Sequence, residues 1–430
     1  MKKSKLLCIV LLFALILCSC GEHAVESSKE SKPTEEITPK YQNLMVNIIP
    51  ENVSSLEDLS QGNKAYHDFA LKVFKESLNK DKNTLISPLS VIYALGLTAN
   101  GADGNTLSQM EDVFGIKIDA LNEYLYSYAK QKEEKTEAKL NIANSIWFTD
   151  DESRLKISES FLKTNATYYK AAANKADFKN PQTVNDINNW VKENTDGTID
   201  KIINEIYPDS IMFLINALSF EAEWMEIYEK KSIKSGEFIT SDQKKIKTEF
   251  MHSSGEKYLW EENAEGFMKK YNGGYAFAAL LPKEGMSLEE YVNSLTGEKI
   301  SNILNGKNPP ISEYEVTASV ALPKFETEYE LEMSYIFQNL GMKDAFTPKA
   351  DFSKLGENNQ AHIGKILHKT FISVDERGTK AGAVTSVDIK DGAFESVTKQ
   401  ITLNRPFLYM LVDTTTNTPI FIGTMMNPSI

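Results

Sequence analysis

Few residues of this 430-residue chain have the types and spacing that enzyme chemistry requires. The five histidines are scattered, without the spacing of a metal site, at His23, His67, His252, His362 and His368. The motifs of a nucleophile elbow, a phosphate-binding loop, a dinucleotide-binding turn and a helical zinc site are all absent from the sequence. Carboxylates are plentiful, but the sequence does not show which of them approach each other, so a paired-acid site is unsupported. We therefore expect a protein that is not an enzyme and that uses neither a metal nor a cofactor.

The other reactive side chains are three cysteines near the amino terminus, Cys8, Cys18 and Cys20. A positive leader precedes an apolar run over 6–17 that is too short for a membrane span, so 1–19 is predicted to be an export signal. Leu17 and the small Ser19 stand three residues and one residue before Cys20, an arrangement that resembles the bacterial lipobox. This resemblance implies cleavage before Cys20 and acylation of its thiol and its new amino group. An ordinary secretory signal that contains cysteines is the alternative, and we favour the lipobox.

The segment after the export signal is polar. Ser, Glu, Lys, Pro and Thr dominate 20–45, and such a stretch cannot bury enough apolar surface to offset its chain entropy. We predict a disordered tether over 20–45, which would carry the lipid on Cys20, followed by one domain over 46–430. The apolar residues of 44–49 are expected to dock on that domain. Because no cysteine follows Cys20, packing without disulfides must stabilise the body.

An alternating pattern marks the segment 379–390. One set of alternate residues is small or apolar throughout: Thr379, Ala381, Ala383, Thr385, Val387 and Ile389. The other set is mostly polar: Lys380, Gly382, Val384, Ser386, Asp388 and Lys390. A period of two predicts a strand with one buried face. The alternation alone favours an ordinary edge strand beside a surface loop.

The elements that must position this segment are of mixed type. Helices are predicted around Tyr66–Phe74, where apolar residues recur at helical spacing, from the Ser87-Pro88 start signal to Asn100, and over 185–203. Strands are predicted at 142–148, 212–220, 275–281, 314–322 and 371–374, with a hairpin buried on both faces over 407–422. Helices dominate first and strands later, so the expected fold class is α+β, in one domain.

Composition sets the outer bounds. The 41% of hydrophobic residues is ample for one large core. The formal charge of −13 argues against a nucleic-acid-binding protein, which would need a basic patch.

Motifs spread over 60–430 resemble, in order, those of the serpin family. The most informative is Glu376-x-Gly378-Thr379-x-Ala381-x-Ala383, which is similar to the hinge of inhibitory serpins. Further matching segments lie at 83–99, 187–199, 216–224, 322–325, 341–353, 404–407 and 423–428. The resemblance implies a single serpin domain, with helices packed around a large mixed central β-sheet, smaller sheets, and an exposed reactive-centre loop over about 376–400.

The resemblance also implies a mechanism. In serpins the loop is bait: a target protease forms an acyl-enzyme with it, and the cut loop inserts into the central sheet and distorts the protease. We therefore expect an irreversible suicide-substrate inhibitor of serine or cysteine proteases. A strand that enters a closed sheet must present small groups first, as Thr379, Ala381 and Ala383 do. Lys380 stands where the family commonly has Glu, but on the outward face, so insertion should survive.

Two alternatives belong to other classes. A non-inhibitory serpin would act as a protease substrate, a carrier or a surface-binding protein, and the small inward residues of the hinge argue against it. A hydrolase with an unrecognised site is remote, because the motifs are absent.

By the same resemblance, two clusters control the sheet. Ser87, Ser90, Asn216 and His368 match the shutter, the hydrogen-bonded region where the sheet opens. Trp224, Lys324 and Glu376 match the breach at the top of the sheet.

The target is less constrained by the sequence. Counting from the hinge or back from Pro406 gives a window for the scissile bond that contains Gly392, Ala393, Phe394 and Glu395. The small residues suit an elastase-like or subtilisin-like enzyme, and Phe394 suits a chymotrypsin-like one. We expect one such serine protease as partner, a membrane reached through the lipid on Cys20, no nucleic acid, and a monomer at the bacterial cell surface or in the extracellular space.

Overall fold

The computed structural model describes residues 40–132, 138–207, 209–306, 315–357, 360–379 and 396–429. The predicted export signal and Cys20 lie outside the described residues. Residues 40–430 form one compact unit, which begins at Lys40 and not at residue 46 as predicted. The difference arises because Tyr41–Asn43 (β1), at the end of the predicted tether, already form the edge strand of a seven-stranded sheet.

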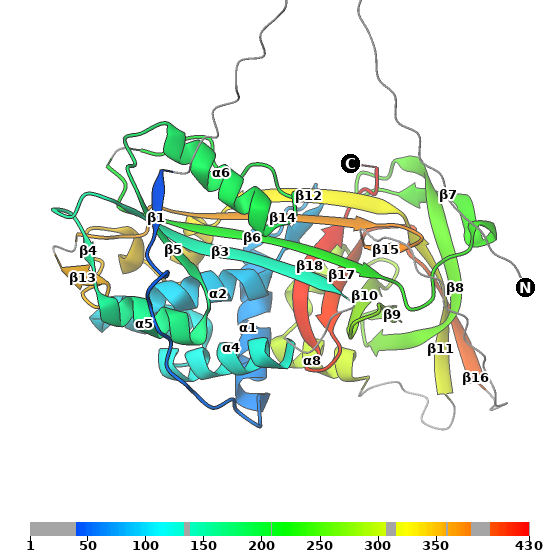
Figure 1. Cartoon of the computed structure of the whole chain (residues 1–430). Helices are drawn as coiled ribbons and strands as arrows, with labels where there is room; N and C mark the ends of the chain where they lie inside the picture. The colour runs from blue at the N-terminus through cyan, green and yellow to red at the C-terminus, as the bar shows by residue number, and fades with distance from the viewer. Residues whose placement is uncertain are drawn as a thin grey trace, which may run out of the picture. The chain divides into compact units, whose positions relative to one another are not determined.

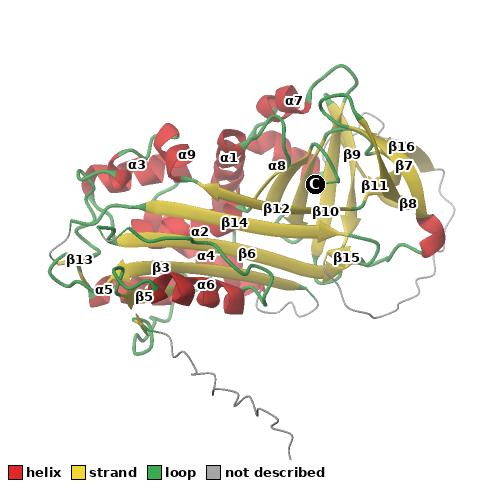
Figure 2. Ribbon diagram, turned by 90° about the horizontal axis from the view of Figure 1, so that it is seen from above, coloured by secondary structure: helices red, strands yellow, loops and turns green. Residues whose placement is uncertain are grey.

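The sheet that contains β1 has seven strands (Figure 2). In spatial order they are β1, β5 (Ala172–Ala176), β3 (Lys139–Thr149), β6 (Met212–Glu223), β15 (Gly378–Thr379), β14 (Lys365–Val374) and β12 (Phe325–Glu332). Two pairings are parallel, β3 with β5 and β6 with β14, and the others are antiparallel. The sheet is therefore mixed, as expected.

A second sheet of nine strands contains the predicted carboxyl-terminal hairpin. Its order is β16 (Ser396–Thr402), β11 (Glu315–Pro323), β8 (Lys245–Glu261), β9 (Ala264–Lys270), β10 (Tyr275–Pro282), β17 (Phe407–Asp413), β18 (Thr418–Met425) and β2 (Thr84–Ile86), with β7 (Ile233–Ile239) paired to β8. Every residue of β17 and β18 is buried, which confirms a hairpin covered on both faces. A small third sheet pairs β4 (Lys156–Ile157) with β13 (Gly356–Glu357).

Nine α-helices lie within the described residues. They are α1 (Ser60–Ser77), α2 (Pro88–Ala99), α3 (Gly104–Phe114), α4 (Ile118–Lys132), α5 (Glu159–Tyr168), α6 (Gln182–Asn194), α7 (Leu288–Ser294), α8 (Gly297–Asn305) and α9 (Ser334–Asn339), with short 3₁₀ turns at Lys230–Ser232 and Asp344–Phe346. None of the helices within these described ranges is both long and apolar enough to cross a bilayer.

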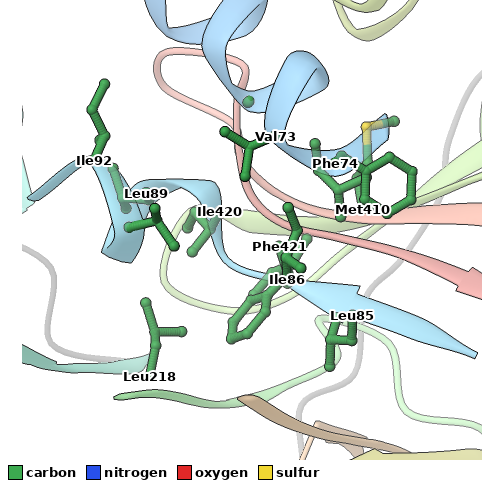
Figure 3. Close-up of a cluster of buried hydrophobic side chains, with 14 of the residues drawn as sticks. Val73, Phe74, Leu85, Ile86, Leu89, Ile92, Leu218, Met410, Ile420 and Phe421 are labelled. Carbon is green, nitrogen blue, oxygen red and sulfur yellow. The ribbon is translucent and has the colours of Figure 1, made fainter. Parts of the chain in front are cut away.

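Helix α2 lies at the centre of the main core. The side chain of Ser87 accepts a hydrogen bond from the Ser90 N–H, and Pro88 occupies the first turn, as the start signal predicts. All residues of α2 are buried, because α1 and α4 pack around it and β3, β6 and β18 line it. Figure 3 shows side chains of α1, β2, α2, β6, β17 and β18 meeting in this core, among them Phe74, Leu89 and Leu218.

Helix α6 lies on the face of the seven-stranded sheet opposite to α2 (Figure 1). Its Ile187 and Val191 form a second apolar cluster with Trp147 and Phe213 of β3 and β6. The helix ends at Asn194 and not near residue 203 as predicted, because Asp196 and Gly197 adopt positive φ angles of 50° and 73°.

Residues 40–59 run from the sheet to α1. Tyr41 packs on Trp147 with ring centroids 4.8 Å apart. Leu44, Met45 and Ile48 pack against the main core, which confirms docking for these three residues of the apolar patch. Val46 and Ile49 of the same patch are exposed, at 73% and 81% of their surface.

Candidate functional site

A row of polar side chains crosses the centre of the seven-stranded sheet. Asn144 on β3, Asn216 on β6 and His368 on β14 lie directly opposite one another in the strand registers. The amide of Asn216 donates to Ser90 Oγ at 2.6 Å and to Asn144 Oδ1 at 2.7 Å. The Ser87 N–H donates to His368 Nε2 at 3.0 Å, so His368 Nδ1 carries the proton and donates to Asn216 Oδ1.

This row contains all four residues that were predicted for the shutter, and it adds Asn144. Ser87, Ser90, Asn216 and His368 are fully buried. Burial lowers the pKa of His368 to about 3, so the ring is neutral at physiological pH. Sequence reasoning missed Asn144, although a polar Asn within the predicted strand 142–148 was a signal for it. The row ties β3, β6 and β14 to the start of α2.

The residues predicted for the breach meet at one end of the same sheet. Lys324 Nζ lies 2.8 Å from Glu376 Oε2 and 3.0 Å from Glu249 Oε2. The hydrogen bond from Lys324 lowers the pKa of the Glu376 carboxyl. Trp224 is buried, donates its ring N–H to the Asp375 carbonyl at 2.8 Å, and stacks on Tyr271 with centroids 4.0 Å apart. Tyr271 carries no sequence motif and was not predicted.

The first hinge residues already belong to the sheet. Gly378 and Thr379 form β15, which lies between the ends of β6 and β14 (Figure 2). Thr379 is fully buried, faces Ala222 and Val374, and its hydroxyl lies 2.7 Å from the Tyr271 hydroxyl. Gly378 has a φ of 153°, and a Cβ there would lie 2.2 Å from the Ala222 carbonyl oxygen, so a larger residue does not fit.

Beyond β15 the sheet is closed. β6 and β14 pair directly in parallel, from Phe213 with Lys365 to Ser219 with Phe371. Between Ser219 and Ala222 the two strands diverge to admit β15. The remaining hinge residues, Ala381 and Ala383, and the predicted scissile window over 392–395 lie outside the described residues.

Hydrogen bonds between strands are the main feature of this site. Over residues 40–429, with the gaps stated above, no group of three His, Cys, Asp or Glu side chains could hold a metal ion. The polar groups of the site instead bond to one another across strands. Such hydrogen bonds can hold a sheet closed and can be exchanged for others when a strand enters.

Comparisons with known proteins agree with this geometry. A family model described as "Serpin (serine protease inhibitor)" matches residues 64–428. A serpin-like protein of Thermococcus kodakarensis is 30% identical over 374 residues, which are 85% of this chain and 85% of that protein. The crystal structure of the thermophilic serpin tengpin in the native state matches with a TM-score of 0.83 and 46% identity, over 90% of this chain and 100% of that one. The latent state of tengpin matches with a TM-score of 0.73 and 47% identity, over 88% and 100%.

Proposed function

Because this chain belongs to the serpin family, we propose that it is an inhibitory serpin, a suicide substrate that traps serine or cysteine proteases. The observation that carries the proposal is the junction of β6, β14 and β15. Thr379 occupies the top of a slot whose lower part is closed by the parallel pairing of β6 with β14. A strand that continued from Thr379 would lie antiparallel to both neighbours.

Insertion of the loop lowers the free energy of the chain in this arrangement. It replaces one parallel ladder with two antiparallel ladders, and antiparallel pairing is slightly more stable per residue. The inward positions Thr379, Ala381 and Ala383 are small, so the strand enters without the overpacking that larger groups would cause. The native form therefore persists through a barrier, which the buried row from Asn144 to His368 raises.

The covalent step is that of an ordinary serine protease. The protease serine oxygen attacks the carbonyl carbon of the scissile peptide and loses its proton to the protease histidine. The peptide C–N bond breaks, the histidine passes the proton to the leaving amine, and an ester joins the loop to the protease. Insertion of the loop before water attacks this ester distorts the protease and leaves the ester intact.

The target class follows from the window over 392–395. Its small residues and Phe394 favour a protease of elastase, subtilisin or chymotrypsin type. Export with a lipid on Cys20 would hold the inhibitor at the cell surface, where it meets secreted proteases.

A panel assay tests the proposal. The purified protein is mixed with subtilisin, chymotrypsin and pancreatic elastase, and the products are separated on a denaturing gel. We expect a band at the summed mass of inhibitor and protease for at least one enzyme, and mass spectrometry of the released carboxyl-terminal fragment identifies the cut bond. Clean cleavage without such a band for every enzyme would favour the non-inhibitory alternative.

The variant Thr379→Arg supplies a stricter test. Thr379 is fully buried between β6 and β14, so an arginine there would bury an unpaired charge and block entry of the strand. We expect the variant to be cleaved at the wild-type rate but to form no covalent complex. Ser241→Arg, which adds the same charge at an exposed position, should inhibit like the wild type. Unchanged trapping by Thr379→Arg would count against loop insertion.

A further inference from the structure

Asp375 organises the turn that joins β14 to β15. Its Oδ1 accepts hydrogen bonds from the N–H groups of Arg377 at 2.8 Å and Gly378 at 3.1 Å. Its own N–H donates to the Gly378 carbonyl at 3.0 Å. A short carboxylate that bonds to the backbone two and three residues ahead holds a tight turn, here at the point where the chain reverses from one strand into the next.

The segment that follows β6 holds the other side of this turn. The carbonyls of Asp375 and Arg377 accept from the ring N–H and the backbone N–H of Trp224, at 2.8 and 2.9 Å. The carbonyl of Glu376 accepts from the Tyr228 N–H at 2.9 Å. Consecutive carbonyls of the turn are thus bound by one short segment, Trp224–Tyr228, while Asp375 binds the N–H groups.

These contacts of the turn fix the register of β15. With the turn fixed, Thr379 can face only Ala222 on one side and Val374 on the other. The hydrogen bond between the Thr379 and Tyr271 hydroxyls also stabilises this register. The β14–β15 hairpin is therefore formed before any protease arrives, and a new strand would grow from it one residue at a time.

We propose that Asp375 is a positioning residue for loop insertion, which holds the hinge in register so that insertion starts from a preformed hairpin. This inference rests on the proposed inhibitory function. Insertion competes with hydrolysis of the acyl-enzyme, so a slower start diverts the inhibitor into cleaved, unproductive product. Asp375 touches no reacting atom and acts through the backbone N–H groups of Arg377 and Gly378.

The test compares Asp375→Ala with Asp375→Asn, which keeps an acceptor oxygen in the same place. Loss of both hydrogen bonds in Asp375→Ala should slow insertion about tenfold, which equals about 1.4 kcal/mol in the barrier. The moles of inhibitor consumed per mole of trapped protease should then rise severalfold, while Asp375→Asn stays close to the wild type. Asp151→Ala is the matched control, because it removes a similar bond to the Ser153 N–H in an exposed turn.

Hydrogen–deuterium exchange of the peptide over 374–379 supplies a readout that needs no inhibition. Asp375→Ala should exchange faster there, and Asp375→Asn and Asp151→Ala should not. Unchanged exchange or unchanged stoichiometry in Asp375→Ala would overturn the inference, as would equal effects of the Asn and Ala variants. If the wild type traps no protease, the proposed function fails, and the exchange data still decide whether Asp375 sets the register.

If Asp375→Ala does not fold, Tyr271→Phe takes its place. That variant removes only the bond to the Thr379 hydroxyl, so the same two measurements should shift in the same direction by less. A stoichiometry and an exchange rate equal to those of the wild type would then contradict the preset register.

Discussion

At the scale of single residues, His368 couples protonation to the closed sheet. Its Nε2 accepts from the Ser87 N–H and its Nδ1 donates to Asn216, so both ring nitrogens are used by the neutral form. A second proton would remove the acceptor at Nε2 and place a charge in a fully buried site. His368 therefore supports the sheet only while it is neutral.

The pH dependence of stability follows in sign and size. The pKa of His368 is near 6.5 in the unfolded chain and about 3 in the folded one, so the unfolded chain binds the proton first as the pH falls. The stabilisation is complete above pH 6.5 and is lost below it, at about 1.4 kcal/mol per pH unit. We expect the free energy of unfolding of the wild type in urea to fall by about 1.4 kcal/mol between pH 7.5 and 5.5, because the slope develops around pH 6.5, and His368→Gln to lack that share of the change. Equal slopes for the two proteins would contradict the assignment.

The residues of this row also show the limit of sequence reasoning. Ser87 was predictable, because Ser followed by Pro at a helix start is a local signal. That Ser87, Asn216 and His368 meet was available only by family resemblance, and Asn144 was not found at all. The contacts among these four residues join positions 72 to 281 residues apart, and no local propensity encodes such distances.

At the scale of elements, the register of β15 predicts the partners of the incoming strand. Thr379 faces Ala222 of β6 and Val374 of β14, so residue 380 would face Glu221 and Ser373. Lys380 would thus lie opposite the carboxylate of Glu221, which at present pairs with Lys139 at 3.8 Å. Lys380, which stands where the family commonly has Glu, would then form a favourable cross-strand pair with Glu221 on the outer face.

A charge exchange tests this register. Lys380→Glu would place two carboxylates opposite each other on insertion, at a cost of about 0.2–1 kcal/mol. We expect it to raise the stoichiometry of inhibition modestly, and the double variant Lys380→Glu with Glu221→Lys to restore the wild-type value. Glu326→Lys, on the exposed face of the edge strand β12, is the control. No effect of Lys380→Glu, or no rescue, would argue for another register.

Elements could be predicted from the sequence where their signals are local. Helices α1 and α2 and the β17–β18 hairpin carry clear periodicity and end signals, and all were predicted. The predicted end of α6 lies beyond the observed one, because the amphipathic pattern continues past Asp196-Gly197, where the chain turns. The sequence places β1 in the tether, because its three polar or aromatic residues carry no strand pattern of their own. They form a strand only because they pair with β5 at the edge of the sheet.

At the scale of the whole molecule, the sheet divides into two parts at the junction of β6 and β14. One part contains β1, β5, β3 and β6, and loop insertion would separate this part from β14 and β12. Residues 40–59 cross this part before they enter α1. Glu51 donates its N–H to Thr167 at 2.9 Å and pairs with Lys163 at 2.7 Å, and Leu56 donates its N–H to Ser127 at 2.8 Å.

This segment therefore opposes movement of β3 and β5 relative to α1, and its loss should shorten the life of the native state. We expect deletion of residues 40–53 to speed spontaneous loss of inhibitory activity at 37 °C, about tenfold if the barrier falls by about 1.4 kcal/mol. Tyr41→Ala, which removes only the contact with Trp147, should have a smaller effect in the same direction. Residual activity is followed over hours, with mass spectrometry to show that the chain stays intact. Equal half-lives for the full-length and shortened proteins would mean that the segment packs on the body without slowing the loss of the native state.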